Sequence, residues 1–169
     1  MTMTLDLKTI VVATDFGQVS DHAFEYARAL AGRFGASLHL LHVVETPLPP
    51  AAWSEGYALD VQGMRAQLED EAAQRLAEIV ARYEGLPITT EVRGGRAAQA
   101  IVECARERQA DLLVLGTHGH GVVAQLLLGS VAERVVRWAP CPVLTVRQQM
   151  GAVRQDVGQA AMPMTAIGS

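Results

Sequence analysis

The sequence has few of the features that mark secreted, membrane-spanning or nucleic-acid-binding proteins. Only two of its 169 residues are cysteines, Cys104 and Cys141, so it suggests neither a disulfide framework nor a zinc set, and both are predicted to be packing thiols. No apolar run approaches the roughly 18 residues of a membrane helix, and the N-terminal MTMTLDLK lacks a signal peptide's apolar segment. A net charge of −4 argues against broad binding to nucleic acid or anionic membranes. We therefore expect a cytoplasmic protein.

Signatures of common catalytic classes are also missing. The chain has no G-x-S-x-G nucleophile elbow, and no lysine follows a glycine as a P-loop requires. No base is evidently placed to activate water at a phosphate, although phosphoryl transfer needs charge stabilisation and positioning together. We therefore expect a protein that binds its ligand and transforms it slowly at most.

Alternating strand and helix patterns fill most of the chain. Short apolar or alternating runs predict five strands, at residues 9–13, 37–44, 87–93, 111–115 and 143–147. Apolar residues at helical spacing predict helices at residues 20–34, 64–83, 97–105 and 131–138. This alternation is typical of one α/β domain whose parallel sheet is covered by helices on both faces.

Residue types predict several details of these elements. Ser20 and Ser130 are predicted N-caps, and Gly35 is predicted to end the first helix. His39 and His42 fall on opposite faces of their strand, so we expect satisfied core or rim histidines rather than a metal pair. The predicted buried helix faces comprise Met64, Leu68, Ala72, Leu76, Ile79, Val80 and Tyr83 in one helix, and Val131, Ala132, Val135 and Val136 in another.

A two-part glycine pattern follows the fourth strand. Its spacing is Gly116-x2-Gly119-x9-Gly129-Ser130, and a helix begins just after it. Glycine lets a ligand approach the backbone, and a helix N-terminus offers unpaired N–H donors to an anion such as phosphate. The shorter match of Gly119, Gly121 and Ala124 to a dinucleotide fingerprint is weak, because it follows a late strand. A purely structural role for the glycines, in a turn and a helix cap, is the alternative.

That spacing resembles the nucleotide-binding motif of the universal stress protein family, on its ATP-binding branch. The resemblance covers roughly residues 7–147 and also rests on VVATDF, LHVV, ADLLVLGTHG, LLLGSVAERVV and APCPVLTV. It implies an open twisted five-stranded parallel sheet of order 3-2-1-4-5, of the Rossmann-like, adenine nucleotide alpha hydrolase-like kind. We expect a universal stress protein domain at residues 1–147 and a flexible C-terminal tail at residues 148–169.

The resemblance also implies which residues hold the ligand. Asp15 suits a ribose hydroxyl or a phosphate-bound Mg²⁺, although it can instead cap the adjacent turn. Unlike many members of the family, this chain has no Arg or Lys between Gly119 and Gln125, so phosphate charge is left to backbone amides, Mg²⁺ and protonated His118 or His120. The implied contacts are Ala13, Thr14, Asp15 and Val43 with adenine and ribose, and Leu115, Gly116, Gly119, Gly129, Ser130 and Val131 with ribose and phosphates.

Taken together, these features predict a dimeric regulatory protein that binds ATP, with AMP and ADP left open. Dimerisation is expected through the edge of the fifth strand. Residues 45–63 are expected to form a lid, a binding loop or an insert, in which Trp53 and Tyr57 cover a bound base or contact a second subunit. Two rival functions stay open: an interaction module of the same fold that binds no nucleotide, and an ATP-hydrolysing or adenylate-forming enzyme.

Overall fold

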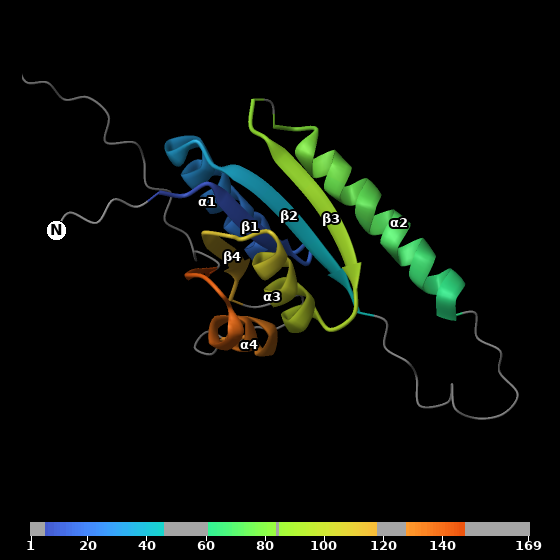
Figure 1. Cartoon of the computed structure of the whole chain (residues 1–169). Helices are drawn as coiled ribbons and strands as arrows, with labels where there is room; N and C mark the ends of the chain where they lie inside the picture. The colour runs from blue at the N-terminus through green and yellow to red at the C-terminus, as the bar shows by residue number, and fades with distance from the viewer. Residues whose placement is uncertain (1–5, 46–60, 84, 118–127, 148–169) are drawn as a thin grey trace, which may run out of the picture.

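Five parallel strands form one open sheet in the order β3-β2-β1-β4-β5, as the resemblance implies (Figure 1). The computed structural model describes residues 6–45, 61–83, 85–117 and 128–147. The strands are β1 (Thr9–Thr14), β2 (Ser37–Val44), β3 (Ile88–Gly94), β4 (Leu112–Gly116) and β5 (Val143–Val146). The helices are α1 (Gln18–Phe34), α2 (Val61–Val80), α3 (Ala97–Glu107) and α4 (Ser130–Trp138). The expected tail at residues 148–169 lies outside the described residues, so the domain boundary at residue 147 stays a prediction.

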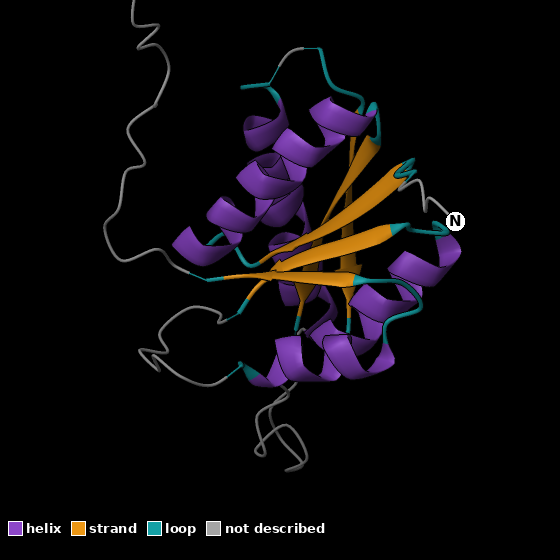
Figure 2. Ribbon diagram, turned by 90° about the vertical axis from the view of Figure 1, so that its left-hand side faces the viewer, coloured by secondary structure: helices purple, strands orange, loops and turns teal. Residues whose placement is uncertain are grey.

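Helices cover both faces of the sheet (Figure 2). Helices α1 and α2 pack on one face, where Ile10, Leu40 and Leu76 belong to a single buried cluster. Helices α3 and α4 pack on the other face, where Val11 and Leu113 belong to a second cluster. Neighbouring residues of β1 thus enter different clusters, because successive side chains of a strand point to opposite faces. The central strands read as continuous apolar runs for this reason.

The two predicted serine caps are wrong. Gly17 is the N-cap of α1, and Ser20 lies inside the helix, where its hydroxyl donates to the Gly17 oxygen at 2.8 Å and accepts the Gly17 N–H at 3.1 Å. Gly129 is the N-cap of α4, and Ser130 is the first helical residue. Because a glycine occupies each N-cap position, no N-cap side chain accepts a hydrogen bond from the N–H groups at the start of the helix. Gly35 ends α1 at φ 69°, as predicted.

Two of the predicted buried faces are too wide. Ala72 and Leu76 of α2 are buried, but Met64 is 55% and Leu68 is 40% exposed. Figure 1 shows α2 lying along β3 at the border of the sheet, where a helix has less sheet surface to cover it. In α4, Ala132 and Val135 are buried while Val136 is 49% exposed, because the helix is short and presents only a narrow stripe to the sheet.

Candidate functional site

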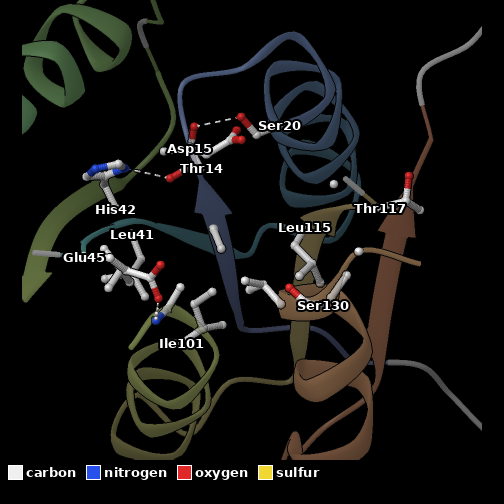
Figure 3. A pocket seen from close by; sticks show the side chains of 17 residues that line it. Thr14, Asp15, Ser20, Leu41, His42, Glu45, Ile101, Leu115, Thr117 and Ser130 are labelled. Atoms are coloured by element: carbon white, nitrogen blue, oxygen red, sulfur yellow. Dashed lines mark hydrogen bonds between the residues drawn. The ribbon is translucent and has the colours of Figure 1, made fainter. Parts of the chain in front are cut away.

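A cavity of about 390 Å³ opens where the winding of the sheet reverses, at the carboxyl ends of β1 and β4 (Figure 3). Ligands of open α/β sheets bind at such a switch point. Nine of the ten predicted site residues line this pocket: Ala13, Thr14, Asp15, Val43, Leu115, Gly116, Gly129, Ser130 and Val131. The tenth, Gly119, lies outside the described residues, as do His118, His120, Trp53 and Tyr57.

The loop after β1 is held in shape by short-range hydrogen bonds. The hydroxyl oxygen of Thr14 accepts the Phe16 N–H at 3.0 Å and lies 3.1 Å from the Ser20 hydroxyl. One carboxylate oxygen of Asp15 accepts the Gly17 N–H at 3.0 Å. Asp15 therefore caps its own turn and lines the pocket as well, so the two roles considered for it are compatible. These bonds support Phe16 at φ 61°, a conformation that is uncommon for a residue with a side chain.

The N-terminus of α4 faces the pocket from the opposite side. The Gly129 N–H donates to the Thr117 oxygen at 2.7 Å, which ties the helix start to the end of β4. Ser130, Val131 and Ala132 form the first turn of the helix, and all three line the pocket. First-turn N–H groups have no acceptor within their own helix, and the aligned peptide dipoles add roughly half a positive charge there. This end of the pocket is suited to an anionic group.

The wall between these two ends is mainly apolar. It is formed by Leu41 and Val43 of β2, Ile101 of α3 and Leu115 of β4. Figure 3 shows Ile101 and Leu115 on the side of the pocket that faces α3 and α4. A flat apolar group such as a nucleobase can be desolvated against this wall.

Glu45 closes the wall at the start of α3. Its carboxylate accepts the backbone N–H of Ala97 at 2.6 Å, and both residues line the pocket. The N-terminus of α3 is therefore already occupied by a carboxylate of the protein, whereas the N-terminus of α4 has no side-chain cap. An anion in this pocket is drawn towards α4 and away from α3.

His42 supports the pocket from the end of β2. Its Nδ1 lies 2.8 Å from the Thr14 carbonyl oxygen, so Nδ1–H donates to that oxygen, and the imidazole stacks on Phe16 with ring centroids 4.3 Å apart. Burial lowers the pKa of His42, and this effect outweighs that of the bond to Thr14, which raises the pKa. The ring is therefore neutral near pH 7. The guanidinium carbon of Arg75 lies 4.2 Å from the centroid of the Phe16 ring, which is the other ring of this stack. His42 is thus a satisfied rim histidine, as predicted.

Charge in the described part of the pocket is of one sign. Asp15 and Glu45 are carboxylates, and no lysine or arginine occurs among the described lining residues. A polyphosphate held here would need its charge offset by the α4 amides and a bound cation. Asp15 is the side chain best suited to face that cation, because a carboxylate is a preferred Mg²⁺ ligand.

Sequence reasoning missed eight lining residues. One of them had a usable signal: Glu45 directly follows β2 at the end of the sheet where Asp15 follows β1. His42 reaches the pocket through its register with Thr14, which the sequence does not show. The α3 residues of the wall had no such signal, because a helical pattern does not show which of its residues will contact a loop far away in the sequence. The full set is Ser20, Leu41, His42, Glu45, Ala97, Ile101, Thr117 and Ala132.

Comparison with known proteins gives the pocket a context. The sequence profile of the Universal stress protein family matches residues 6–147. A universal stress protein of Methanocaldococcus jannaschii is 36% identical over 141 residues, which cover 83% of this chain and 82% of that one. No described helix is long and apolar enough to cross a membrane.

Solved structures agree with that match. The universal stress protein UspA from Lactobacillus plantarum superposes with a TM-score of 0.67 at 25% identity, covering 85% of this chain and all of that one. A universal stress protein crystallised in complex with cAMP gives a TM-score of 0.57 at 30% identity, covering 83% and 97%. The sheet order, the pocket at its switch point and these matches lead to one conclusion: the chain belongs to the universal stress protein family.

Proposed function

We propose that the chain binds an adenine nucleotide, with ATP and Mg²⁺ as its ligands, in the pocket between β1, β4 and α4. The observation that carries this proposal is the arrangement of the pocket, which joins an apolar wall to an uncapped helix N-terminus. A nucleotide has the same two parts, a flat base and an anionic phosphate. The cAMP complex of a relative supports the choice of an adenine nucleotide.

The residue assignments follow the two ends of the pocket. Adenine and ribose lie against Ala13, Thr14, Asp15 and Val43, and Asp15 contacts a ribose hydroxyl or the cation. Ribose and phosphates lie against Leu115, Gly116, Gly119, Gly129, Ser130 and Val131, where first-turn amides donate to phosphate oxygens. Gly119 enters from the sequence motif alone.

Ser130 offers a test that removes a single backbone donor. Proline is favoured at the first helical position, and Gly129 already has φ −62° and ψ 154°, which suit the residue before a proline. Ser130→Pro should therefore fold while losing one N–H that faces the phosphate. Because a hydrogen bond to a charged group contributes about 1.5–3 kcal/mol, we expect affinity for Mg-ATP to fall about tenfold or more.

Titration calorimetry of nucleotide-free protein measures this loss. Ser130→Ala is the matched control, since it removes the hydroxyl and keeps the N–H, and it should bind like the native chain. AMP, ADP and cAMP titrated in parallel rank the ligands by phosphate charge. Equal affinity of the native and Ser130→Pro proteins would show that the phosphate does not bind at the start of α4. If the native chain bound no adenine nucleotide, the proposal would be refuted.

The regulatory role is part of the same proposal. We propose that nucleotide occupancy acts as a signal and that hydrolysis is slow at most, because the described lining residues include no lysine or arginine to stabilise a transferring phosphoryl group. Phosphate release by the native protein and by Asp15→Ala, measured side by side, tests this. Rapid release that depends on Asp15 would favour an ATP-hydrolysing enzyme. An unchanged melting temperature in excess Mg-ATP would favour an interaction module without nucleotide.

We also propose a cytoplasmic homodimer joined at β5. In the strand order, β5 is an edge strand that pairs with β4 on one side, and Trp138 at the end of α4 is 52% exposed. An unpaired edge is a template for pairing with another chain. Sedimentation at micromolar concentration should give the mass of two chains, and a single chain at that concentration would rule out this interface.

A further inference from the structure

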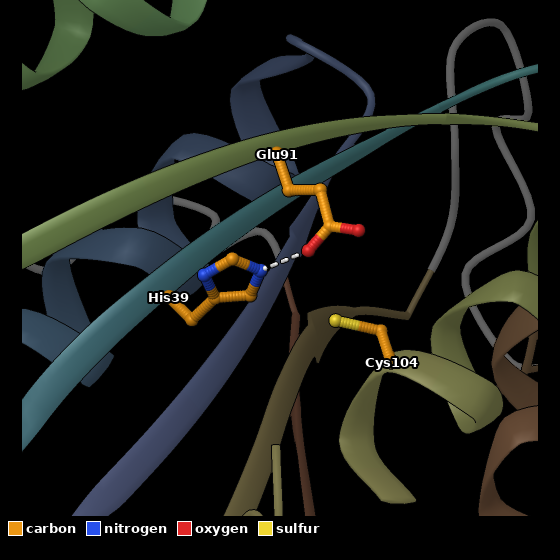
Figure 4. Close-up of side chains that lie close together, drawn as sticks. All are labelled: His39, Glu91 and Cys104. Atoms are coloured by element: carbon orange, nitrogen blue, oxygen red, sulfur yellow. Dashed lines mark hydrogen bonds and ion pairs between the residues drawn. The ribbon is translucent and has the colours of Figure 1, made fainter. Parts of the chain in front are cut away.

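Three side chains of types that can bind metal ions meet on the α3 side of the sheet, outside the pocket described above. They are His39 of β2, Glu91 of β3 and Cys104 of α3, here called the His39–Glu91–Cys104 cluster (Figure 4). One ligand atom from each lies within 4.8 Å of the others, and His39 Nε2 is 2.9 Å from Glu91 Oε2. Figure 4 shows the Cys104 sulfur directed from α3 towards the other two side chains. None of the three lines the pocket.

The ligand types match the preference of one class of metal ion. Zn²⁺ binds imidazole nitrogen, carboxylate oxygen and thiolate sulfur at about 2.0–2.3 Å, so its tetrahedral ligand atoms lie roughly 3.3–3.8 Å apart. To reach such spacing, Nε2 and Oε2, which lie 2.9 Å apart, need to separate slightly, and atom pairs as far as 4.8 Å apart need to approach by about 1 Å. Three protein ligands with water in the fourth position are a common set for this ion.

Further side chains hold the ligands in orientation. Thr89 Oγ1 lies 2.8 Å from His39 Nδ1 and 3.4 Å from the Leu38 oxygen. Its hydroxyl can therefore accept from Nδ1–H while donating to Leu38, which leaves Nε2 with a lone pair for a metal. Arg93 donates to the other carboxylate oxygen of Glu91, Oε1. Hydrogen bonds to the atoms of a ligand residue that do not face the metal fix the tautomer of a ligating histidine and the direction of a carboxylate.

The surrounding charge is balanced. Arg93 and Arg108 each form an ion pair with Glu91, and Arg93 also pairs with Glu107. Two guanidinium groups thus face two carboxylates, so these four side chains together carry no net charge. Arg108 contacts the proposed ligand atom, Glu91 Oε2, at 2.9 Å, but its side chain is 42% exposed and can turn towards solvent. Glu91 is 24% exposed, which gives an ion a route from the β3 edge to the buried His39 and Cys104.

We propose that the His39–Glu91–Cys104 cluster binds a divalent cation of the Zn²⁺ class through His39 Nε2, Glu91 Oε2 and Cys104 Sγ, with water as the fourth ligand. Binding breaks the S–H bond of Cys104 and releases its proton to solvent. In the metal-free cluster the single ring proton of neutral His39 lies on Nε2, between Nε2 and Glu91 Oε2. Binding shifts this proton to Nδ1, where Thr89 Oγ1 accepts it, so Cys104 supplies the only proton released. The site joins β2, β3 and α3, so an occupied site ties the β3 border of the sheet to the α3 layer.

Cobalt(II) is the probe, because its thiolate complexes give a sulfur-to-metal charge-transfer band in the near ultraviolet and tetrahedral ones absorb strongly in the visible. The chain contains only two cysteines, so Cys141→Ala is a matched control for Cys104→Ser. We expect both bands in the native and Cys141→Ala proteins after equilibration with Co²⁺. We expect the sulfur band to be lost in Cys104→Ser, and Zn²⁺ to bleach the native spectrum at one equivalent.

Two additional variants separate metal binding from a structural role. His39→Gln should weaken Co²⁺ binding at least tenfold, whereas Arg108→Gln should tighten it severalfold by removing the competing partner of Oε2. Circular dichroism of each variant shows whether it is folded. Absence of a sulfur-to-cobalt band in the native protein would overturn the proposal, and so would a band that depends on Cys141. Weaker binding in Arg108→Gln would also contradict the assigned ligand atom.

Discussion

The Nδ1 atom of His42 lies 2.8 Å from the backbone oxygen of Thr14, and this bond joins the ends of β2 and β1 beside the pocket at the switch point of the sheet. Both residues line that pocket. The shape of the loop carrying Asp15 therefore depends on a histidine from the neighbouring strand, and this histidine is neutral in the folded protein because burial lowers its pKa.

His42 should make folding stability depend on pH. The unfolded chain takes up a proton at His42 as the pH falls below about 6.5, whereas the folded chain, with its lowered pKa, does not. Stability is therefore lost as the pH falls from about 6.5 towards the folded pKa, by at most about 1.4 kcal/mol per pH unit.

His42→Asn tests this by keeping an N–H near Thr14 without a titrating group. Urea unfolding at pH 7.5 and 5.5 should show a smaller loss of stability on acidification in the variant than in the native protein. His39, whose pKa is also lowered by burial, is present in both proteins and cancels in the comparison. An equal loss in both would show that His42 is not responsible.

Glu45→Gln should strengthen nucleotide binding. The substitution keeps an acceptor for the Ala97 N–H but removes one of the two carboxylates of the described pocket lining. We expect affinity to rise about two- to fivefold, more for ATP than for cAMP and less at high salt, because the effect is electrostatic. Stability should fall by about 0.5 kcal/mol as α3 loses a favourable charge at its N-terminus. The control is Glu78→Gln on the exposed surface of α2, and an equal gain there would assign the effect to net charge alone.

Gly32 and Gly35 should respond to alanine with opposite signs. A Cβ added at either position meets no atom within 4 Å, so crowding plays no part. Gly32 lies inside α1, where alanine is favoured by roughly 0.5–1 kcal/mol. Gly35 has φ 69°, where a side chain costs about 1 kcal/mol or more. Thermal unfolding should rank Gly32→Ala above the native protein and Gly35→Ala below it, and the same sign for both would contradict the φ argument.

Leu76→Ala should destabilise the protein far more than Leu68→Ala. Leu76 is fully buried, and its truncation leaves a cavity that costs about 2–5 kcal/mol. Leu68 lies two turns earlier on α2 and is 40% exposed, so its truncation should cost less than about 0.5 kcal/mol. Denaturant unfolding of the two variants measures the difference. Similar losses would mean that the first half of α2 is covered in solution, for example by a second chain.

Much of the fold could be predicted because its pattern is local. The strands are short apolar or alternating runs, and the five predicted strands agree with β1 to β5 to within one residue at each end. The glycine pattern is visible in the sequence as a break directly after the fourth of these runs. The family resemblance assigned Asp15 and Gly116 to one ligand, and both line the pocket.

The helix caps and exposed faces could not be predicted in the same way. Ser20 and Gly17 are both acceptable caps by residue type, and the choice depends on which residue the loop leaves with extended backbone angles. The periodicity of α2 is the same along its length, but whether an apolar residue is covered depends on how far the sheet extends beneath it. Met64 and Leu68 are exposed for that reason.

The sequence by itself determined the alternation of strands and helices, the apolar core positions of the strands and the glycine pattern that follows β4. Each of these depends on residues close together in the chain. Only the tertiary structure decided that Glu45 occupies the start of α3, that Ile101 completes the apolar wall, and that His39, Glu91 and Cys104 meet. These contacts join residues that are far apart in the sequence. They are set by strand register and helix packing, which no local pattern encodes.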